Sequence, residues 1–151
     1  MEFRKIDRSN YWECMELTVD DSQKDFVADN KQSLVEAAYE ENLYTLGIYC
    51  QDTMVGFILY DYDDQIPGWS MSRFMIGKQY QGKGYGKRLM EYARDKKHMD
   101  KVDVNEQNEK ALQFYLHLGF QVIGRDETDS MGKPFPILHL QLPEADSTNR
   151  D

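Results

Sequence analysis

The chain has 151 residues, of which 30% are charged, and its 27 acidic and 18 basic residues give a formal net charge of -9. This length is typical of one domain built around one hydrophobic core. The negative field repels phosphate backbones, so we expect no nucleic-acid partner. No apolar run approaches the roughly 20 residues that span a bilayer, and residues 1–5 do not resemble a signal peptide. We therefore expect a cytoplasmic protein without membrane contact.

Cysteine and histidine residues are scattered along the sequence. Cys14 and Cys50 lie far apart in no paired pattern, so we expect two free thiols in a reducing compartment. His98, His117 and His139 have no Cys or His neighbour at ligand spacing. We therefore expect no metal site.

Two residue pairs have the spacing of a capping box, which marks the start of a helix. Asn10 and Glu13 form the first pair and predict a helix that continues through Leu17. Ser33 and Glu36 form the second pair and predict another helix directly after Ser33. In chain order, we expect strands at 3–6, 43–50, 53–60, 69–76, 101–104, 120–126 and 135–142, and helices at 10–17, 34–41, 84–97 and 109–118.

Strands outnumber helices in this order, and the two kinds neither alternate strictly nor separate into blocks. That order predicts a layered α/β (α+β) domain, in which helices pack on a sheet. The polar pair Gln51-Asp52 separates two β-rich runs and predicts a hairpin. We expect the domain to cover residues 1–143 and a polar tail to follow at 144–151.

A glycine-rich turn lies between an expected strand and an expected helix. Gly82, Gly84 and Gly86 occupy three of five successive positions, and glycine permits positive φ and a close approach of the backbone to a ligand. The helix after the turn presents free N–H groups and the positive end of its dipole. Lys83 and Lys87 add positive charge. The turn therefore predicts a phosphate or pyrophosphate site, with an ordinary strand–helix corner as the alternative.

Three phosphate-binding patterns can be compared with this turn. The dinucleotide pattern G-x-G-x-x-G fails because Lys87 stands where the third glycine is needed. The P-loop pattern fails because Gly84 stands where a Ser or Thr binds magnesium. The pattern Q/R-x-x-G-x-G/A is satisfied in full by Gln81-Gly82-Lys83-Gly84-Tyr85-Gly86.

This last motif resembles the diagnostic motif of the GCN5-related N-acetyltransferase (GNAT) superfamily. A second segment, further along the chain, is similar to the family's N-x-x-A-x-x-F-Y-x-x-x-G-F pattern in order and separation. The resemblance implies an acetyl-CoA-dependent acyltransferase with a mixed, mostly antiparallel sheet of six to seven strands and about four helices. The matching residues of the second segment are Asn108, Ala111, Phe114, Tyr115, Gly119 and Phe120.

In the family, the glycine turn binds the coenzyme A pyrophosphate, and the strand before it binds the pantetheine arm through its backbone. The resemblance therefore implies acetyl-CoA as co-substrate, without a metal. Asn108 either contacts the coenzyme or caps its own helix. The residues to which the resemblance gives a coenzyme-binding role are Phe74, Met75, Ile76, Gln81, Gly82, Lys83, Gly84, Tyr85, Gly86, Lys87, Asn108 and Ala111.

Acyl transfer from a thioester to an amine, by direct attack in a ternary complex, requires stabilisation of the leaving thiolate. A phenol with a pKa near 10 is a competent donor, and the resemblance gives this role to Tyr115. The alternative is that Tyr115 only packs beside Phe114. The backbone N–H groups near Phe74 and Met75 would polarise the thioester carbonyl.

The general base is where the sequence departs from the family pattern. Many relatives carry a Glu on the strand before the glycine turn, whereas Ser70 and Met71 occupy that region here. We expect deprotonation of the amine to use a water chain, or a carboxylate such as Asp61 or Asp63.

The acceptor is expected to be a small cationic amine. Glu36, Asp61 and Asp63, with nearby Tyr60 and Tyr62, suit a polycation through ion pairs and cation–π contacts. A solvated acidic surface is the alternative.

The segment 26–39 also resembles the bacterial spermine/spermidine acetyltransferase branch of the family, which implies a polyamine acceptor. A protein or peptide N-acetyltransferase and a non-catalytic coenzyme A-binding module are the alternatives. The exposed aromatic residues are also compatible with a homodimer.

Overall fold

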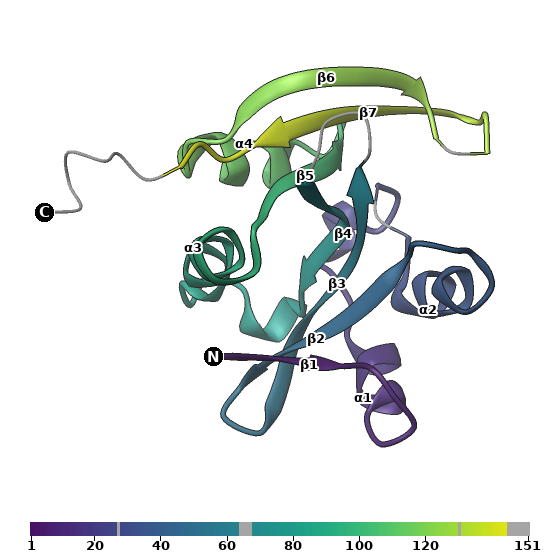
Figure 1. The fold of residues 1–151 in the computed structure, drawn as a ribbon, viewed down its shortest axis with the longest axis vertical. Coiled ribbons are helices and arrows are strands. Elements are labelled where there is room, and N and C mark those ends of the chain that lie inside the picture. The colour runs from purple at the N-terminus through teal and green to yellow at the C-terminus, as the bar shows by residue number, and fades with distance from the viewer. Residues whose placement is uncertain (27, 64–67, 130, 145–151) are drawn as a thin grey trace, which may run out of the picture.

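The structure is a computed structural model that describes residues 1–26, 28–63, 68–129 and 131–144 (Figure 1). Seven strands form one sheet in the order β1-β2-β3-β4-β5-β7-β6. From residue 145 onward, the expected polar tail lies outside the described residues. The strands are β1 (Glu2–Lys5), β2 (Tyr44–Cys50), β3 (Thr53–Asp63), β4 (Gly68–Ile76), β5 (Met99–Asn105), β6 (Gln121–Thr128) and β7 (Pro134–Gln141), and the helices are α1 (Tyr11–Glu16), α2 (Asn30–Tyr39), α3 (Tyr85–Lys97) and α4 (Glu109–His117), with single 3-10 turns η1 (Asp21–Gln23) and η2 (Lys78–Tyr80).

The sheet is mixed and mostly antiparallel, as expected. Among the described strand pairs, β4 and β5 are the one parallel pair. The expected hairpin at Gln51-Asp52 is confirmed, because Cys50 faces Thr53 across the turn and Gln51 adopts a positive φ of 58°. No helix in the described ranges combines the length and the apolar character that a membrane span needs.

The sheet is the middle layer of the fold (Figure 1). Leu89 and Met90 of α3 and Tyr115 of α4 are buried in one apolar cluster, which covers one face. Cys14 of α1 is buried in a second cluster on the other face, which the apolar residues of α2 also border. Burial of apolar area on both faces is the main stabilising term for such a sheet.

The capping of the first two helices differs from the prediction. Helix α2 begins at Asn30, because the Asp29 carboxylate accepts a hydrogen bond from Gln32 N at 2.8 Å and caps the helix. Ser33 lies inside this helix, and its hydroxyl donates to the Asp29 carbonyl at 3.2 Å. The predicted capping box that opens at Ser33 is therefore wrong.

The predicted capping box at Asn10 is also wrong, although α1 does begin directly after this residue. The Asn10 side chain accepts from Asp7 N and donates to the Lys5 carbonyl and to the Tyr49 hydroxyl, so it makes no capping bond. The Glu13 carboxylate instead accepts from the backbone N–H of Met54 at 2.9 Å.

The sheet opens between β4 and β5. These strands pair only where Trp69, Ser70 and Met71 face β5. The β3–β4 register also shifts at this point, since Leu59 faces Arg73 and Tyr60 faces Met71. The extra β4 residue forms a bulge, which bends the strand. Beyond the bulge, the edge of β4 that faces β5 carries no paired strand in the described part of the sheet, and the backbone there is free for a ligand.

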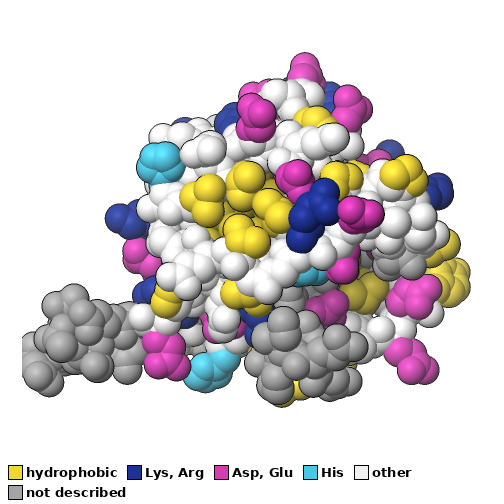
Figure 2. All heavy atoms as spheres, turned by 90° about the horizontal axis from the view of Figure 1, so that it is seen from above, with side chains coloured by type: hydrophobic (Ala, Val, Ile, Leu, Met, Phe, Trp, Pro, Cys, Tyr) yellow, Lys and Arg dark blue, Asp and Glu magenta, His cyan; other side chains and the backbone are white. Residues whose placement is uncertain are grey.

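Strand β6 forms one edge of the sheet, and its side chains are mostly exposed. Figure 2, which views the molecule from the β6–β7 side, shows hydrophobic side chains gathered on this face. Val122 and Ile123 are the exposed large hydrophobic residues of β6, 51% and 37% exposed. An unpaired edge of this kind is a common place for contact between copies of a chain. The homodimer stays a prediction.

Candidate active site

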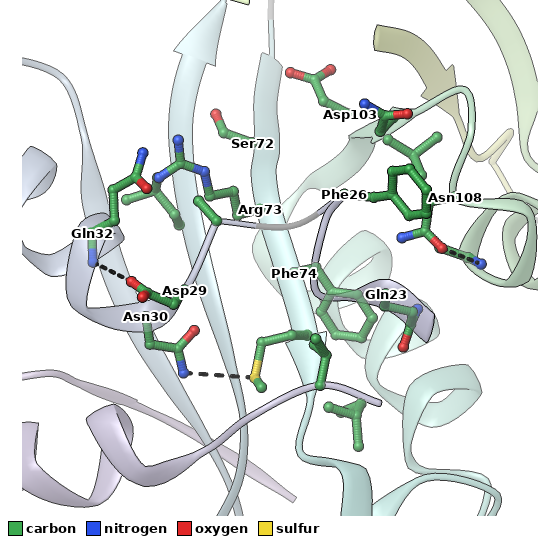
Figure 3. Close-up of a pocket in the computed structure, with 18 of the residues that line it drawn as sticks. Gln23, Phe26, Asp29, Asn30, Gln32, Ser72, Arg73, Phe74, Asp103 and Asn108 are labelled. Atoms are coloured by element: carbon green, nitrogen blue, oxygen red, sulfur yellow. Dashed lines mark hydrogen bonds between the residues drawn. The ribbon is translucent and has the colours of Figure 1, made fainter. Parts of the chain in front are cut away.

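A cavity of about 1550 Å³ occupies the opening between β4 and β5 (Figure 3). It extends from the glycine turn and the first turns of α3 and α4 on one side of the sheet to α2 and the β6–β7 hairpin on the other side. Of the residues predicted for the site, Lys83 is exposed and does not line the cavity, and the side chain of Asp63 lies outside the described structure. The cavity brings together Phe74, Met75, Ile76, Gln81, Gly82, Gly84, Tyr85, Gly86, Lys87, Asn108, Ala111, Tyr115, Glu36 and Asp61.

The glycine turn leaves open space in front of its backbone. Gly82 and Gly84 have positive φ of 78° and 80°, and a β-carbon added to either would meet no heavy atom within 4 Å. Gly84 is the N-cap of α3, whose first N–H groups have no partner within the helix. Backbone donors, the helix dipole and nearby Lys87 fit an anionic phosphate. The corner therefore has the features of a pyrophosphate site.

Gln81 holds this turn in place. Its side-chain amide donates to the Ile76 carbonyl at 2.9 Å and to Gln23 Oε1 at 3.4 Å, and its oxygen accepts from Lys110 Nζ at 3.1 Å. Lys110 also lies 3.6 Å from an Asp20 carboxylate oxygen. These contacts of Gln23 and Lys110 with the turn were not predicted, because no spacing rule links η1 to α4.

Asn108 is buried, and its side-chain oxygen accepts from Ala111 N at 3.3 Å. It is therefore the N-cap of α4, which was one of the two readings of this residue. Asn108 also lines the cavity, so the cap does not exclude contact between its amide nitrogen and a ligand.

Tyr115 is 4% exposed and lines the cavity from α4. Its ring packs edge-on against Phe114 and Phe120, with centroids 5.4 and 5.3 Å away, and lies 6.5 Å from Phe74 of β4. Burial raises the pKa of the Tyr115 hydroxyl well above its ordinary value, and the negative charge of Asp103 raises it further. The hydroxyl therefore stays protonated at neutral pH and is a hydrogen-bond donor.

Glu36 is already paired within the cavity. Its carboxylate lies 2.8 Å from Arg73 Nη1, and the same guanidinium nitrogen donates to the Ser33 hydroxyl at 3.0 Å. Partial burial raises the pKa of Glu36, but hydrogen bonds from Gln32 and Arg73 outweigh burial, so the pKa is lowered overall. The ion pair with Arg73 was not predicted, and it partly neutralises the carboxylate that was predicted to bind substrate.

Further carboxylates line the same side of the cavity. Asp61 accepts a hydrogen bond from the Ser72 hydroxyl at 3.1 Å. Asp103 of β5 and Asp126 of β6 bracket the imidazole of His139 on β7, at 2.6 and 2.7 Å. The sequence analysis missed these last three residues. Asp103 lies between Val102 and Val104, and His139 between Leu138 and Leu140, so the period-2 alternation of a strand could have placed both opposite the core.

The comparisons with known proteins agree with this site. Residues 15–135 match the family described as an acetyltransferase (GNAT) domain. The chain is 35% identical over 127 residues to a peptidyl-lysine N-acetyltransferase, YjaB of Salmonella typhimurium, covering 82% of this chain and 83% of the relative. It is 26% identical over 153 residues to the spermine/spermidine N(1)-acetyltransferase of Bacillus subtilis, covering 93% and 99% of the two chains.

The solution structure of apo-form YjaB from Escherichia coli superposes with a TM-score of 0.67 at 28% identity, over 95% of this chain and 98% of that one. The family, the fold and the predicted acyl donor therefore all indicate the same kind of enzyme. The chain belongs to the GNAT acetyltransferase family and is an N-acetyltransferase that uses acetyl-CoA.

Proposed function

We propose that this enzyme acetylates the side-chain amine of lysine in a protein or peptide. The observation that carries the proposal is the acceptor side of the cavity, where carboxylates from α2, β3, β5 and β6 surround the opening beside the free edge of β4. Such a set attracts a primary ammonium group. The identity of 35% to a peptidyl-lysine N-acetyltransferase, against 26% to the polyamine enzyme, favours lysine as the carrier of that ammonium.

On the donor side, the residues fit acetyl-CoA. The open glycine turn and the α3 N-terminus would bind the pyrophosphate, with Lys87 adding charge. The free edge of β4 at Phe74, Met75 and Ile76 would bind the pantetheine arm through its backbone. Backbone N–H groups near Phe74 and Met75 would then polarise the thioester carbonyl.

Tyr115 would assist departure of the CoA thiolate. Its raised pKa makes complete proton transfer to a thiolate, whose own pKa is about 8.5, unfavourable. A neutral, buried hydroxyl still donates a strong hydrogen bond to an anionic sulfur. Tyr115 is therefore proposed as a hydrogen-bond donor that stabilises the leaving group.

A polyamine is the second candidate acceptor. It is supported by the number of carboxylates in the cavity, since a second ammonium group of spermidine needs a second anionic partner. Membership of the GNAT family leaves no support for the non-catalytic coenzyme A-binding module.

The two acceptors can be separated by steady-state kinetics with acetyl-CoA. Release of free CoA thiol is measured with a lysine-containing peptide blocked at its N-terminus, and with spermidine and spermine. We expect the highest kcat/KM for the peptide, with the acetyl group located on lysine by mass spectrometry. A higher kcat/KM for spermidine would assign the polyamine instead. A Tyr115→Phe variant should lose about 100-fold in kcat while it still binds CoA.

A further inference from the structure

Three charged side chains from three different strands form a cluster in the acceptor side of the cavity. His139 of β7 directs Nδ1 at Asp103 of β5, 2.6 Å away, and Nε2 at Asp126 of β6, 2.7 Å away. Side-chain exposure rises from 27% at Asp103 to 66% at Asp126, so the cluster runs from the interior to the rim.

The geometry of this cluster requires a protonated imidazole. A neutral imidazole has one N–H donor, whereas both ring nitrogens of His139 lie at hydrogen-bond distance from carboxylates, which only accept. In agreement, the hydrogen bond to Asp103 raises the pKa of His139 to about 9, with Asp126 adding to the effect and partial burial opposing it. At neutral pH the cluster therefore has a net charge of -1, and each carboxylate is held by a charged hydrogen bond.

Asp103 lies at the point where the sheet opens. Val102 is the last β5 residue to pair with β4, through Met71, so Asp103 is the first residue beyond the pairing. Its negative charge adds to the effect of burial in raising the pKa of the Tyr115 hydroxyl. In Figure 3, Asp103 on β5 and Ser72 on β4 both point into the upper part of the pocket. Asp103 of β5 and Tyr115 of α4, the proposed hydrogen-bond donor, thus line the same cavity.

Two other cavity carboxylates, Glu36 and Asp61, are less suited to contact the reacting amine. Glu36 lies on α2, not on either of the strands that border the opening. Asp61 lies on β3, which β4 separates from β5, and it accepts from the Ser72 hydroxyl. Asp103 is the carboxylate that combines a position at the opening with a partner that fixes its orientation.

We propose that Asp103 is the catalytic base of the acetyl transfer, and that His139 and Asp126 position it. This inference rests on the proposed function, since it assigns a residue to deprotonate the acceptor ammonium. Overall, the amine nitrogen forms a bond to the acetyl carbon, the carbon–sulfur bond breaks, and the nitrogen loses two protons. One proton passes to Asp103 and then to water, and the other ends on the CoA sulfur.

A carboxylate is a weak base towards an alkylammonium ion, because their ordinary pKa values differ by about six. An ammonium nitrogen has no lone pair, so its first proton has to leave just before the nitrogen attacks, in an unfavourable transfer that the attack then draws forward; the second proton becomes acidic as the bond to the acetyl carbon forms. A carboxylate held next to the nitrogen can accept the proton at that moment. Asp61 of β3, Arg73 of β4, Glu36 of α2 and Tyr115 of α4 line the same cavity. The further charged or titratable side chains that line it, besides His139 and Asp126, are Lys24, Asp25, Asp29, Lys31, Glu40, Glu41, Tyr80, Tyr85, Lys87, Lys110 and Asp129.

The test is an Asp103→Asn variant, whose side chain has the same shape and can still accept a hydrogen bond from His139. With an alkylamine that the wild type acetylates, we expect a loss of about 100-fold or more in kcat at pH 7, with unchanged acetyl-CoA affinity by calorimetry.

The pH profile is the second readout. Between pH 6.5 and 8.5, wild-type kcat/KM should be nearly flat, whereas that of the variant should rise about tenfold per pH unit, because the variant depends on amine that has already lost its proton to solvent. Parallel pH profiles, or a loss below about threefold, would overturn the assignment.

Two further variants separate a catalytic effect from a change of charge. Glu127→Gln removes a carboxylate from the same strand as Asp126, but this side chain is 86% exposed and does not line the cavity, so activity should not change. His139→Gln should lower kcat about tenfold and keep the flat profile, as expected of a positioning residue. A loss with Glu127→Gln equal to that of Asp103→Asn would contradict the proposal. A wild type that acetylates no amine would instead overturn the proposed function, and the inference with it.

Discussion

Gly86 and Phe114 lie so close that a β-carbon on Gly86 would come within 2.7 Å of the Phe114 Cζ. The third glycine of the turn therefore serves the contact between α3 and α4, whereas Gly82 and Gly84 face open space with positive φ. One motif thus contains glycines that are required for two different physical reasons.

A Gly86→Val variant should be destabilised, because the added carbons overpack the contact with Phe114 at a cost of about 1–3 kcal/mol. For a chain of this size, we expect the midpoint of thermal unfolding to fall by several degrees. Gly82→Ala is the matched variant: its strained φ costs about 1–2 kcal/mol, and its methyl group projects into the space in front of the turn. Gly82→Ala should therefore weaken CoA binding in calorimetry more than its stability loss alone explains. Equal CoA affinity in Gly82→Ala and wild type would show that this space is not the pyrophosphate site.

Asn108 has one observed role, the cap of α4, and one proposed role in CoA binding, and substitutions can separate them. Asn108→Ala removes the cap of α4 and should cost about 1 kcal/mol, measured by denaturant unfolding. Asn108→Asp retains the cap, since a carboxylate also accepts from Ala111 N. If the Asn108 amide also contacts CoA, the Asp variant should be as stable as wild type and bind CoA at least tenfold more weakly. Wild-type CoA affinity in the Asp variant would leave Asn108 with a structural role alone.

The donor side of the site could be predicted because its residues are adjacent in sequence. The segment from Gln81 to Gly86 forms one turn, and the segment from Asn108 to Phe120 forms one helix with its cap and exit. Each pattern reflects local backbone requirements, and local requirements are visible in a sequence.

The acceptor side could not be predicted in the same way. Asp103 and His139 are 36 positions apart and meet only because β5 pairs with β7. The alternation of Val102, Asp103 and Val104 predicts the face of the sheet on which Asp103 lies, but the residue it contacts depends on sheet order and register.

The error at α2 has a different cause: Asp29 and Ser33 are both good N-cap residues, and the apolar period begins only after Ser33. The turn from Asn30 to Gln32 is polar, so the pattern gave no reason to start the helix earlier.

Arg73 is expected to limit the affinity of the cavity for polycations, because it neutralises Glu36 at 2.8 Å. Arg73→Gln should free this carboxylate and lower the KM for spermidine by about fivefold at low ionic strength, with a smaller effect for a lysine peptide, which carries one ammonium group. The effect should shrink at high salt, since the cavity is open to solvent. An increased KM for spermidine would show that Arg73 orders α2 rather than opposing the substrate.

The imidazolium of His139 should make stability depend on pH in a defined direction. Its pKa is about 9 in the folded protein against an ordinary value of 6.5, so between these values the folded state holds a proton that the unfolded chain releases. The stabilisation is fully present below pH 6.5 and is lost as the pH rises through 9. Relative to His139→Gln, the wild type should therefore have its largest advantage in thermal midpoint at pH 6 and a much smaller one at pH 9.5.

The same pH scan on Glu127→Gln should show a difference in thermal midpoint from wild type that does not vary with pH, because that exposed carboxylate is not in contact with the imidazole. A constant difference between wild type and His139→Gln over this range would mean that His139 stabilises the fold by packing alone and that its charge does not hold Asp103 in place.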